Sequence, residues 1–111
     1  MNEEIIEYKK MLEEAIDLLG YTELRYSLFA GRNNNRAEYQ ARIEFIDGHF
    51  EVYMTGERAS AFNSVKYDEF FPAYTELLQM MQFMVLRNRR SVKEGKEPEY
   101  PCPLWDNEKA E

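Results

Sequence analysis

The side chains best suited to do chemistry lie in one stretch, 41-ARIEFIDGHFEVYMTGERASAF-62, where charged and aromatic residues alternate with apolar ones. Glu44 and Glu51 are spaced to face each other across a hairpin, and a close pair of carboxylates is a common arrangement for general acid–base catalysis. One of the two must then have its pKa raised, most effectively by burial. Both are predicted to lie on an open polar face without a pocket, so the sequence does not favour an acid–base site.

The other reactive side chains are scattered. His49 and Cys102 are the one histidine and the one cysteine of the chain. Nucleophilic catalysis needs a nucleophile, a base and an orienting group within hydrogen-bond reach, and a metal site needs clustered ligands. Gly31 and Gly56 stand alone, unlike the glycines of a phosphate-binding loop. We therefore expect no enzyme, no catalytic residue, no metal site and no cofactor.

A β-hairpin is predicted to position the charged residues of this stretch. Asp47-Gly48 is a strong signal for a two-residue type I′ turn, because both central residues of that turn need positive φ. Apolar and polar residues alternate on both sides of it, as in half-buried strands. This turn fixes the register: Ile46 pairs with His49, Phe45 with Phe50, Glu44 with Glu51, Ile43 with Val52, Arg42 with Tyr53 and Ala41 with Met54.

This register places Phe45, Phe50, Ile43, Val52 and the pair Ala41–Met54 on the inner side of the sheet. The outer side is predicted to be wet. Like charges directly opposite each other on a sheet destabilise it by a few tenths to about 1 kcal/mol. Either drift tolerated this cost or a partner uses the face. We hypothesise a partner-binding face centred on an aromatic side chain, and reversing its acidic charges should leave folding intact. Its members are Glu38, Arg42, Glu44, Glu51, Tyr53 and Glu57.

The flanking segments predict an α+β fold with an N-terminal helix, an antiparallel three- to four-stranded meander, a long apolar C-terminal helix and an extended Pro-rich tail. Apolar residues at three- and four-residue steps predict helices over residues 3–19 and 72–90. Period-two alternation predicts a strand over residues 23–30, and 31-GRNNNR-36 is typical of a loop. The inner face of the sheet, with Tyr39 at its start, should pack against both helices.

At 111 residues with 44% hydrophobic content, the chain is predicted to be a single domain, 1–111. Its core would span residues 1–96, and the tail 97–111 would pack back through its apolar residues. A single cysteine, an acidic N-terminus unlike a signal peptide, and no apolar run of membrane-spanning length favour a cytoplasmic protein. The net charge of −7 argues against direct nucleic-acid binding and is compatible with a basic protein partner or with solubility alone.

Two consecutive stretches, 48-GHFEVYMTGERASAF-62 and 63-NSVKYDEFFPAYTELLQMM-81, resemble small bacterial immunity proteins of polymorphic toxin systems. Those families show a glycine-turned strand followed by a Phe-led step into an apolar helix. Ala59 departs from the pattern, which has a glycine there. The resemblance implies a cytoplasmic antidote that occludes the active site of a cognate toxin, and the acidic face would suit a basic or nucleic-acid-acting toxin. The matching residues are Gly48, Val52, Tyr53, Glu57, Arg58 and Phe62.

Two alternatives remain open at this point. An acidic phage or mobile-element inhibitor of a nucleic-acid-binding machine would carry the same surface, and the neighbouring genes would distinguish it from an antidote. A structural homodimer built on the apolar helix 72–90 would show itself by its mass in solution. No membrane partner is expected.

Overall fold

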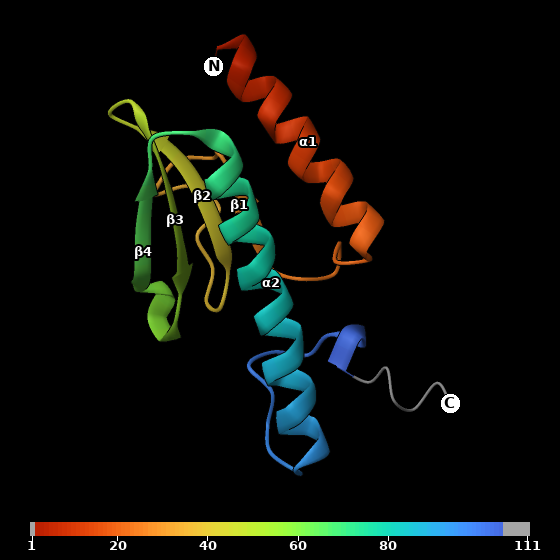
Figure 1. Cartoon of the computed structure of the whole chain (residues 1–111). Helices are drawn as coiled ribbons and strands as arrows, with labels where there is room; N and C mark the ends of the chain where they lie inside the picture. The colour runs from red at the N-terminus through yellow and green to blue at the C-terminus, as the bar shows by residue number, and fades with distance from the viewer. Residues whose placement is uncertain (1, 106–111) are drawn as a thin grey trace.

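The computed structural model describes residues 2–105, with the side chains of residues 62 and 63 excepted. The elements are α1 (Glu3–Leu19), β1 (Tyr26–Leu28), β2 (Ala41–Ile46), β3 (His49–Thr55), the short 3-10 helix η1 (Glu57–Ala59), β4 (Ala61–Tyr67) and α2 (Phe70–Lys93). The strands form one mixed sheet in the order β1-β2-β3-β4, and the helices cover one face of it (Figure 1). The predicted α+β fold is confirmed.

The first helix has the predicted boundaries, and its ends show why. Asn2 caps it by accepting a hydrogen bond from the backbone N–H of Ile5 at 2.9 Å. Gly20 ends it with φ 76°, a left-handed conformation that costs glycine nothing. Ile5, Leu12 and Ile16 are buried from this helix.

The β2–β3 hairpin also follows the prediction. Asp47 and Gly48 both have positive φ, 52° and 81°, as a type I′ turn requires. All six predicted cross-strand pairs are present, from Ile46 with His49 at the turn to Ala41 with Met54 at the far end. β4 then pairs antiparallel with β3, with a register shift between Val52 and Met54.

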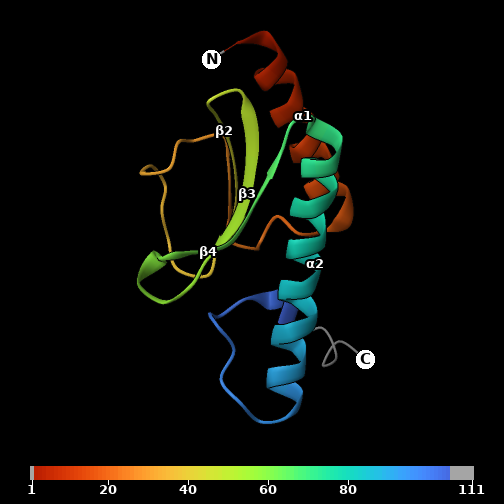
Figure 2. The same cartoon turned by 60° about the vertical axis from the view of Figure 1, so that its left-hand side comes forward.

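The first strand differs from the prediction. Only Tyr26–Leu28 of the expected strand 23–30 is extended, and it runs parallel to β2, with Tyr26 beside Ala41 and Leu28 beside Ile43. The expected purely antiparallel meander is therefore wrong. Two parallel neighbours need a crossover of about a dozen residues, and residues 29–40 provide it here. Because the helices occupy one face of the sheet, this crossover runs over the other (Figure 2).

The core lies between the inner face of the sheet and the helices. Ile43 and Val52 are fully buried there against α2 residues such as Leu77 and Met81, as the hairpin register predicted. Phe45 is an exception at 41% exposure, since it lies near the hairpin tip, beyond the reach of full helix cover.

The second helix starts two residues before and ends three residues after the predicted range 72–90. Residues 97–105 return along it, and Tyr100, Cys102 and Trp105 are buried in the same core. The Tyr100 hydroxyl accepts a hydrogen bond from the backbone N–H of Arg25 at 2.9 Å, which ties this segment to the start of the sheet. Residues 106–111 of the predicted tail lie outside the described residues.

Candidate functional site

The crossover residues 29–40, called the loop cap below, lie over the polar face of the sheet. Beneath them Arg42, Glu44 and Tyr53 are only 0%, 1% and 2% exposed, and Glu51 is also buried. The expectation that this face is wet is therefore wrong. The face is buried because β1 pairs parallel with β2, which sends the connecting chain across it.

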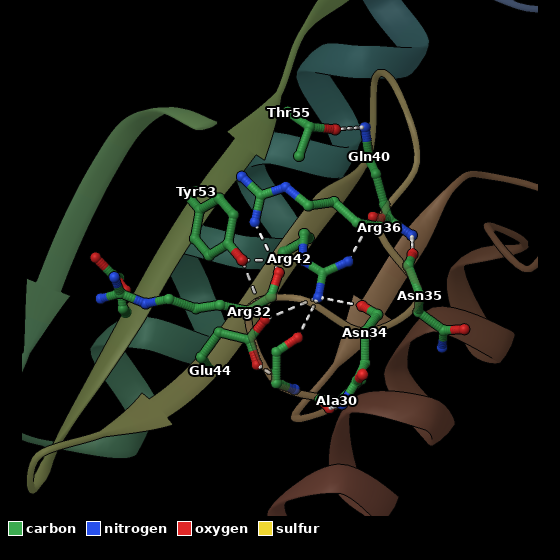
Figure 3. Close-up of polar contacts among 12 residues, drawn as sticks. Ala30, Arg32, Asn34, Asn35, Arg36, Gln40, Arg42, Glu44, Tyr53 and Thr55 are labelled. Carbon is green, nitrogen blue, oxygen red and sulfur yellow. Dashed lines mark hydrogen bonds and ion pairs between the residues drawn. The ribbon is translucent and has the colours of Figure 1, made fainter. Parts of the chain in front are cut away.

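Arg42 is the centre of the buried polar cluster, and it uses its donors on both the sheet and the loop cap (Figure 3). Its Nη2 forms an ion pair with Glu44 at 3.0 Å, with both side chains almost fully buried. Its five hydrogen bonds run to Tyr53 Oη at 2.9 Å, Gln40 Oε1 at 2.7 Å, Gly31 O at 2.7 Å, Asn34 O at 2.7 Å and Glu44 Oε2 at 3.0 Å. A buried guanidinium is tolerated because its donors are satisfied in this way.

The two facing carboxylates have separate partners. Besides Arg42, Glu44 accepts hydrogen bonds from the backbone N–H of Gly31 at 2.9 Å and from the Tyr53 hydroxyl at 3.1 Å. Glu51 instead accepts from Arg32 Nη2 at 2.7 Å and from Ser64 Oγ at 2.7 Å. The predicted like-charge pair exists in register, but each charge has its own cation.

Tyr53 links the arginine and the carboxylate. Its hydroxyl accepts from Arg42 Nε and donates to Glu44 Oε2, so it must be protonated to complete the network. Burial raises the pKa of Tyr53 above its usual value, and the hydrogen bond from Arg42 only partly offsets this. The neutral phenol is therefore the form that the site favours.

The far end of the loop cap is fixed by a second set of hydrogen bonds. The backbone N–H of Gln40 donates to Thr55 Oγ1 at 2.8 Å, and the Thr55 hydroxyl donates to Ala37 O at 2.6 Å. The Gln40 amide donates to Asn35 O at 2.9 Å. Asn35 is left-handed, with φ 57°, a conformation that asparagine adopts more readily than most residues. The loop cap is thus attached to the sheet at both ends.

The surface above the buried cluster is formed by the loop cap and the turn after β3. Arg36 donates to Ala59 O at 2.8 Å, and Glu38 accepts from the backbone N–H of Arg58 at 2.8 Å, which joins the two segments. Of the six residues predicted to bind a partner, Glu38 and Glu57 are exposed here. The other four are buried below, so they cannot touch a partner in this conformation.

The same turn explains the one departure from the immunity-protein pattern. Ala59 has φ 58°, and Arg58 before it has φ 60°. Both are left-handed, and glycine is the residue that adopts this conformation without steric cost. A glycine at position 59, as the pattern has it, would fit the geometry, and alanine holds it with some strain.

Residues at the surface of this site were missed by the sequence hypothesis. Arg32 and Arg36 come from the loop, and both are exposed, so the surface over the site carries cations as well as the expected acids Glu38 and Glu57. The available signal was partial: Gln40, Glu44 and Tyr53 of the polar face accept from the buried guanidinium, but its other two acceptors are carbonyl oxygens of the loop cap. Pairing Arg32 with Glu51 needed the crossover, which the sequence did not indicate.

The geometry is that of a binding surface on a fixed support. Within residues 2–105, no three histidine, cysteine or acidic side chains come together as metal ligands. No described helix has the length and apolar content to cross a membrane. His49 lies at the hairpin tip. The buried Cys102 lies elsewhere, with its Sγ 3.6 Å from the carbonyl oxygen of Glu23.

Comparison with known proteins identifies the family. The family model of immunity protein 59 matches residues 5–106, which is nearly the whole chain. Neither a curated protein nor a solved structure matches. The match extends well beyond the two stretches that carried the resemblance, and it covers the helices, the sheet and the loop cap. The chain belongs to the immunity protein 59 family.

Proposed function

We propose that this protein is an antidote that binds a cognate toxin as an intact protein and blocks its active site, without catalysing a reaction. The family membership supports an antidote over an inhibitor of a nucleic-acid-binding machine. The observation that carries the binding role is the loop cap, which is irregular in backbone yet held by hydrogen bonds to the two members of a buried ion pair.

A fixed loop suits tight binding. A loop that must be ordered on association loses affinity in proportion to the freedom it gives up, and a preorganised loop avoids that loss. Arg42 orders Gly31 and Asn34 of the loop cap, and Gln40 orders its end. The hypothesised partner-binding set thereby divides into two roles. Glu38 and Glu57 contact the toxin, and the buried Arg42, Glu44, Glu51 and Tyr53 position the surface around them.

The charge of the whole chain supports a basic toxin. A net charge of −7 attracts a positively charged partner at long range and speeds association, whichever residues finally touch. A toxin that acts on nucleic acid has such a surface. The antidote would meet it in the cytoplasm, where nucleic acid is accessible. Raising the salt concentration should then slow association more than it speeds dissociation.

The test needs the cognate toxin domain, which is to be sought among the genes beside this one. Expression of that domain alone should stop growth of a bacterial host, and co-expression with the antidote should restore it. Purified antidote should inhibit the toxin at a one-to-one ratio, and mass spectrometry should find the toxin's covalent mass unchanged. A toxin that is modified, or that loses activity at substoichiometric antidote, would indicate an enzyme instead.

A matched pair of charge reversals tests the surface. Arg36→Glu changes the loop cap, whereas Lys10→Glu makes the same change on α1, in the other layer of the molecule. The loop-cap variant should reduce protection, and the α1 variant should act only through net charge. If both variants protect equally well, the toxin binds elsewhere on the molecule.

A further inference from the structure

One edge of the sheet has unpaired backbone groups whose positions follow from the hairpin. In an antiparallel sheet, the N–H and C=O groups of alternate residues point to the same neighbour. A two-residue turn makes Ile46 and His49 a hydrogen-bonded pair, so the backbone of His49 points toward β2. The backbone groups of Phe50 and Val52, one step out of phase, therefore point toward β4.

The same alternation continues across β4. Tyr67 and Val65 are the partners of Phe50 and Val52, so their backbone groups point back to β3. Those of Lys66, which lies between these two residues, point away from it, whereas Ser64 stands in the stretch where the register shifts. Since β4 is the last strand of the sheet, the N–H and C=O groups of Lys66 lie on its free edge (Figure 1). A row of such groups is a template for another strand.

A groove runs beside this edge on the inner side of the sheet. Its volume is about 850 Å³, and it lies between β4 and α2. Val65, Met80 and Phe83 give it apolar walls, and Phe83 is 63% exposed although it lies on the helix that forms the core. Three charged residues also line it: Glu76, Arg87 and Glu99. Apolar side chains of an added strand would enter this groove.

The outer side of the same edge is hollow and cationic. A hollow of about 290 Å³ has Ser64 of β4 on one side and Arg32 and Arg36 of the loop cap on the other. Its one carboxylate, Glu51, already accepts hydrogen bonds from Arg32 and Ser64. Lys66 is exposed on this outer face, opposite Glu51 in the register. Acidic side chains of an added strand would meet an excess of positive charge here.

We propose that the toxin places an extended segment against β4 as a fifth strand, with alternating apolar and acidic residues. Its backbone pairs with the free-edge groups of Lys66. Its apolar side chains enter the groove beside Phe83, and its acidic side chains face Arg32 and Arg36. This inference rests on the antidote function and specifies where and how the partner binds.

Charge separates this occupant from a second copy of the chain. Two copies that paired through β4 would bring their own outer sides together, each carrying Arg32, Arg36 and Lys66. Like charges across paired strands are destabilising. An edge lysine is also a common device that hinders self-pairing of sheets. The edge is therefore suited to a different chain with acidic residues.

Amide hydrogen exchange of the complex tests the strand directly. The probe is the toxin domain that the growth test identifies, carrying an inactivating substitution. In the free protein, the amide of Lys66 should exchange fast because it faces solvent. In the complex it should become protected by about tenfold or more, as hydrogen-bonded strand amides are. If it stays unprotected while the toxin is bound and inhibited, the strand proposal is overturned and the antidote function stands.

A pair of substitutions at one position isolates the backbone contribution. Lys66→Pro removes a free-edge N–H that β3 does not use, whereas Lys66→Ala removes only the charged side chain. The proline variant should weaken toxin binding by about tenfold or more, and the alanine variant by less than about threefold. Equal effects of the two variants would contradict backbone pairing. If the proline variant fails to fold, as judged by circular dichroism, the exchange experiment on the wild type decides.

The groove and the self-pairing alternative have their own controls. Phe83→Glu puts a charge into the apolar groove and should weaken binding, while Phe71→Glu makes the same change at an exposed α2 residue outside the groove and should not. Light scattering reports the oligomeric state. A wild-type dimer that Lys66→Pro converts to a monomer would assign the edge to a second copy and overturn the proposal. If the wild type does not inhibit the toxin at all, the antidote function itself fails.

Discussion

Replacing Arg42 by methionine tests whether the buried ion pair fixes the loop cap. Methionine reaches about as far as the Nε of arginine and keeps the contacts of the stem, but it removes the charge and all five hydrogen bonds. Glu44, only 1% exposed, would then keep two neutral donors, the N–H of Gly31 and the Tyr53 hydroxyl. The carbonyl oxygens of Gly31 and Asn34 would lose their common donor.

The expected cost follows from that list. Removing one partner of a buried ion pair typically costs about 3–5 kcal/mol, because the remaining charge is buried without compensation. The carbonyl oxygens that lose a donor add to this cost wherever water cannot reach them. A domain of this size is stable by about 5–15 kcal/mol in total. Arg42→Met should therefore lower the free energy of unfolding by about 3–5 kcal/mol and leave the protein marginally folded.

Equilibrium urea denaturation measures this difference, and a double-mutant cycle assigns it. If most of the cost is the unpaired carboxylate, adding Glu44→Met should recover part of it, since replacing both ions by apolar groups is often nearly neutral. The coupling between the two sites should be about 2–3 kcal/mol, at the upper end for neighbouring residues. A loss below about 1 kcal/mol for Arg42→Met, with the two substitutions additive, would refute this account of the loop cap.

Three further outcomes follow from other parts of the structure. Glu44→Lys should destabilise the fold by several kcal/mol in urea denaturation, since it puts a second cation beside Arg42 in a buried site. The sequence led us to expect instead that reversing this charge leaves folding intact, and an unchanged denaturation midpoint would support that expectation. Burial raises the pKa of Tyr100 to about 12, so its stabilising contribution is complete below pH 10 and is lost as the pH rises through 12. Between these values the wild type should lose about 1–2 kcal/mol more unfolding free energy than Tyr100→Phe, allowing for screening by water, and parallel pH curves would contradict the assignment. Ala59→Gly should raise the free energy of unfolding by about 0.5–1 kcal/mol, because glycine adopts the left-handed backbone at this position without strain. As a control, Ala15→Gly in the middle of α1 should lower the free energy of unfolding by about as much. If both variants lose stability, no strain is present at position 59.

The hairpin was predictable because its determinants are local. Asp47 and Gly48 fix the turn, the turn fixes the register, and period-two alternation assigns the two faces. The boundaries of α1 follow likewise from a capping asparagine and a terminating glycine. In both elements, the residues that decide the structure lie within a few positions of the segment that they shape.

The covered polar face was not predictable by the same means. Alternation in a short strand is the same whether its neighbour is parallel or antiparallel, so Tyr26–Leu28 gave no sign of its direction. A loop rich in asparagine is typical of the solvent-exposed surface. Whether Glu44 faces water or a buried arginine depends on where that loop passes, which is a non-local property of the chain.

Tyr53→Phe distinguishes the two accounts of the partner-binding residues. The sequence hypothesis has Tyr53 in direct contact with the toxin, whereas the structure buries it at 2% exposure between Arg42 and Glu44. If it acts through the loop cap, removing only its hydroxyl should lower stability by about 1–3 kcal/mol, since buried partners on both sides lose a hydrogen bond. The amide of Gly31, held by Glu44, should then exchange faster in the free protein, and toxin affinity should fall because the loop must be ordered on binding. Exchange is the decisive readout. If affinity falls while the loop exchanges as in the wild type, Tyr53 must touch the toxin itself, and the loop cap must open when the toxin binds.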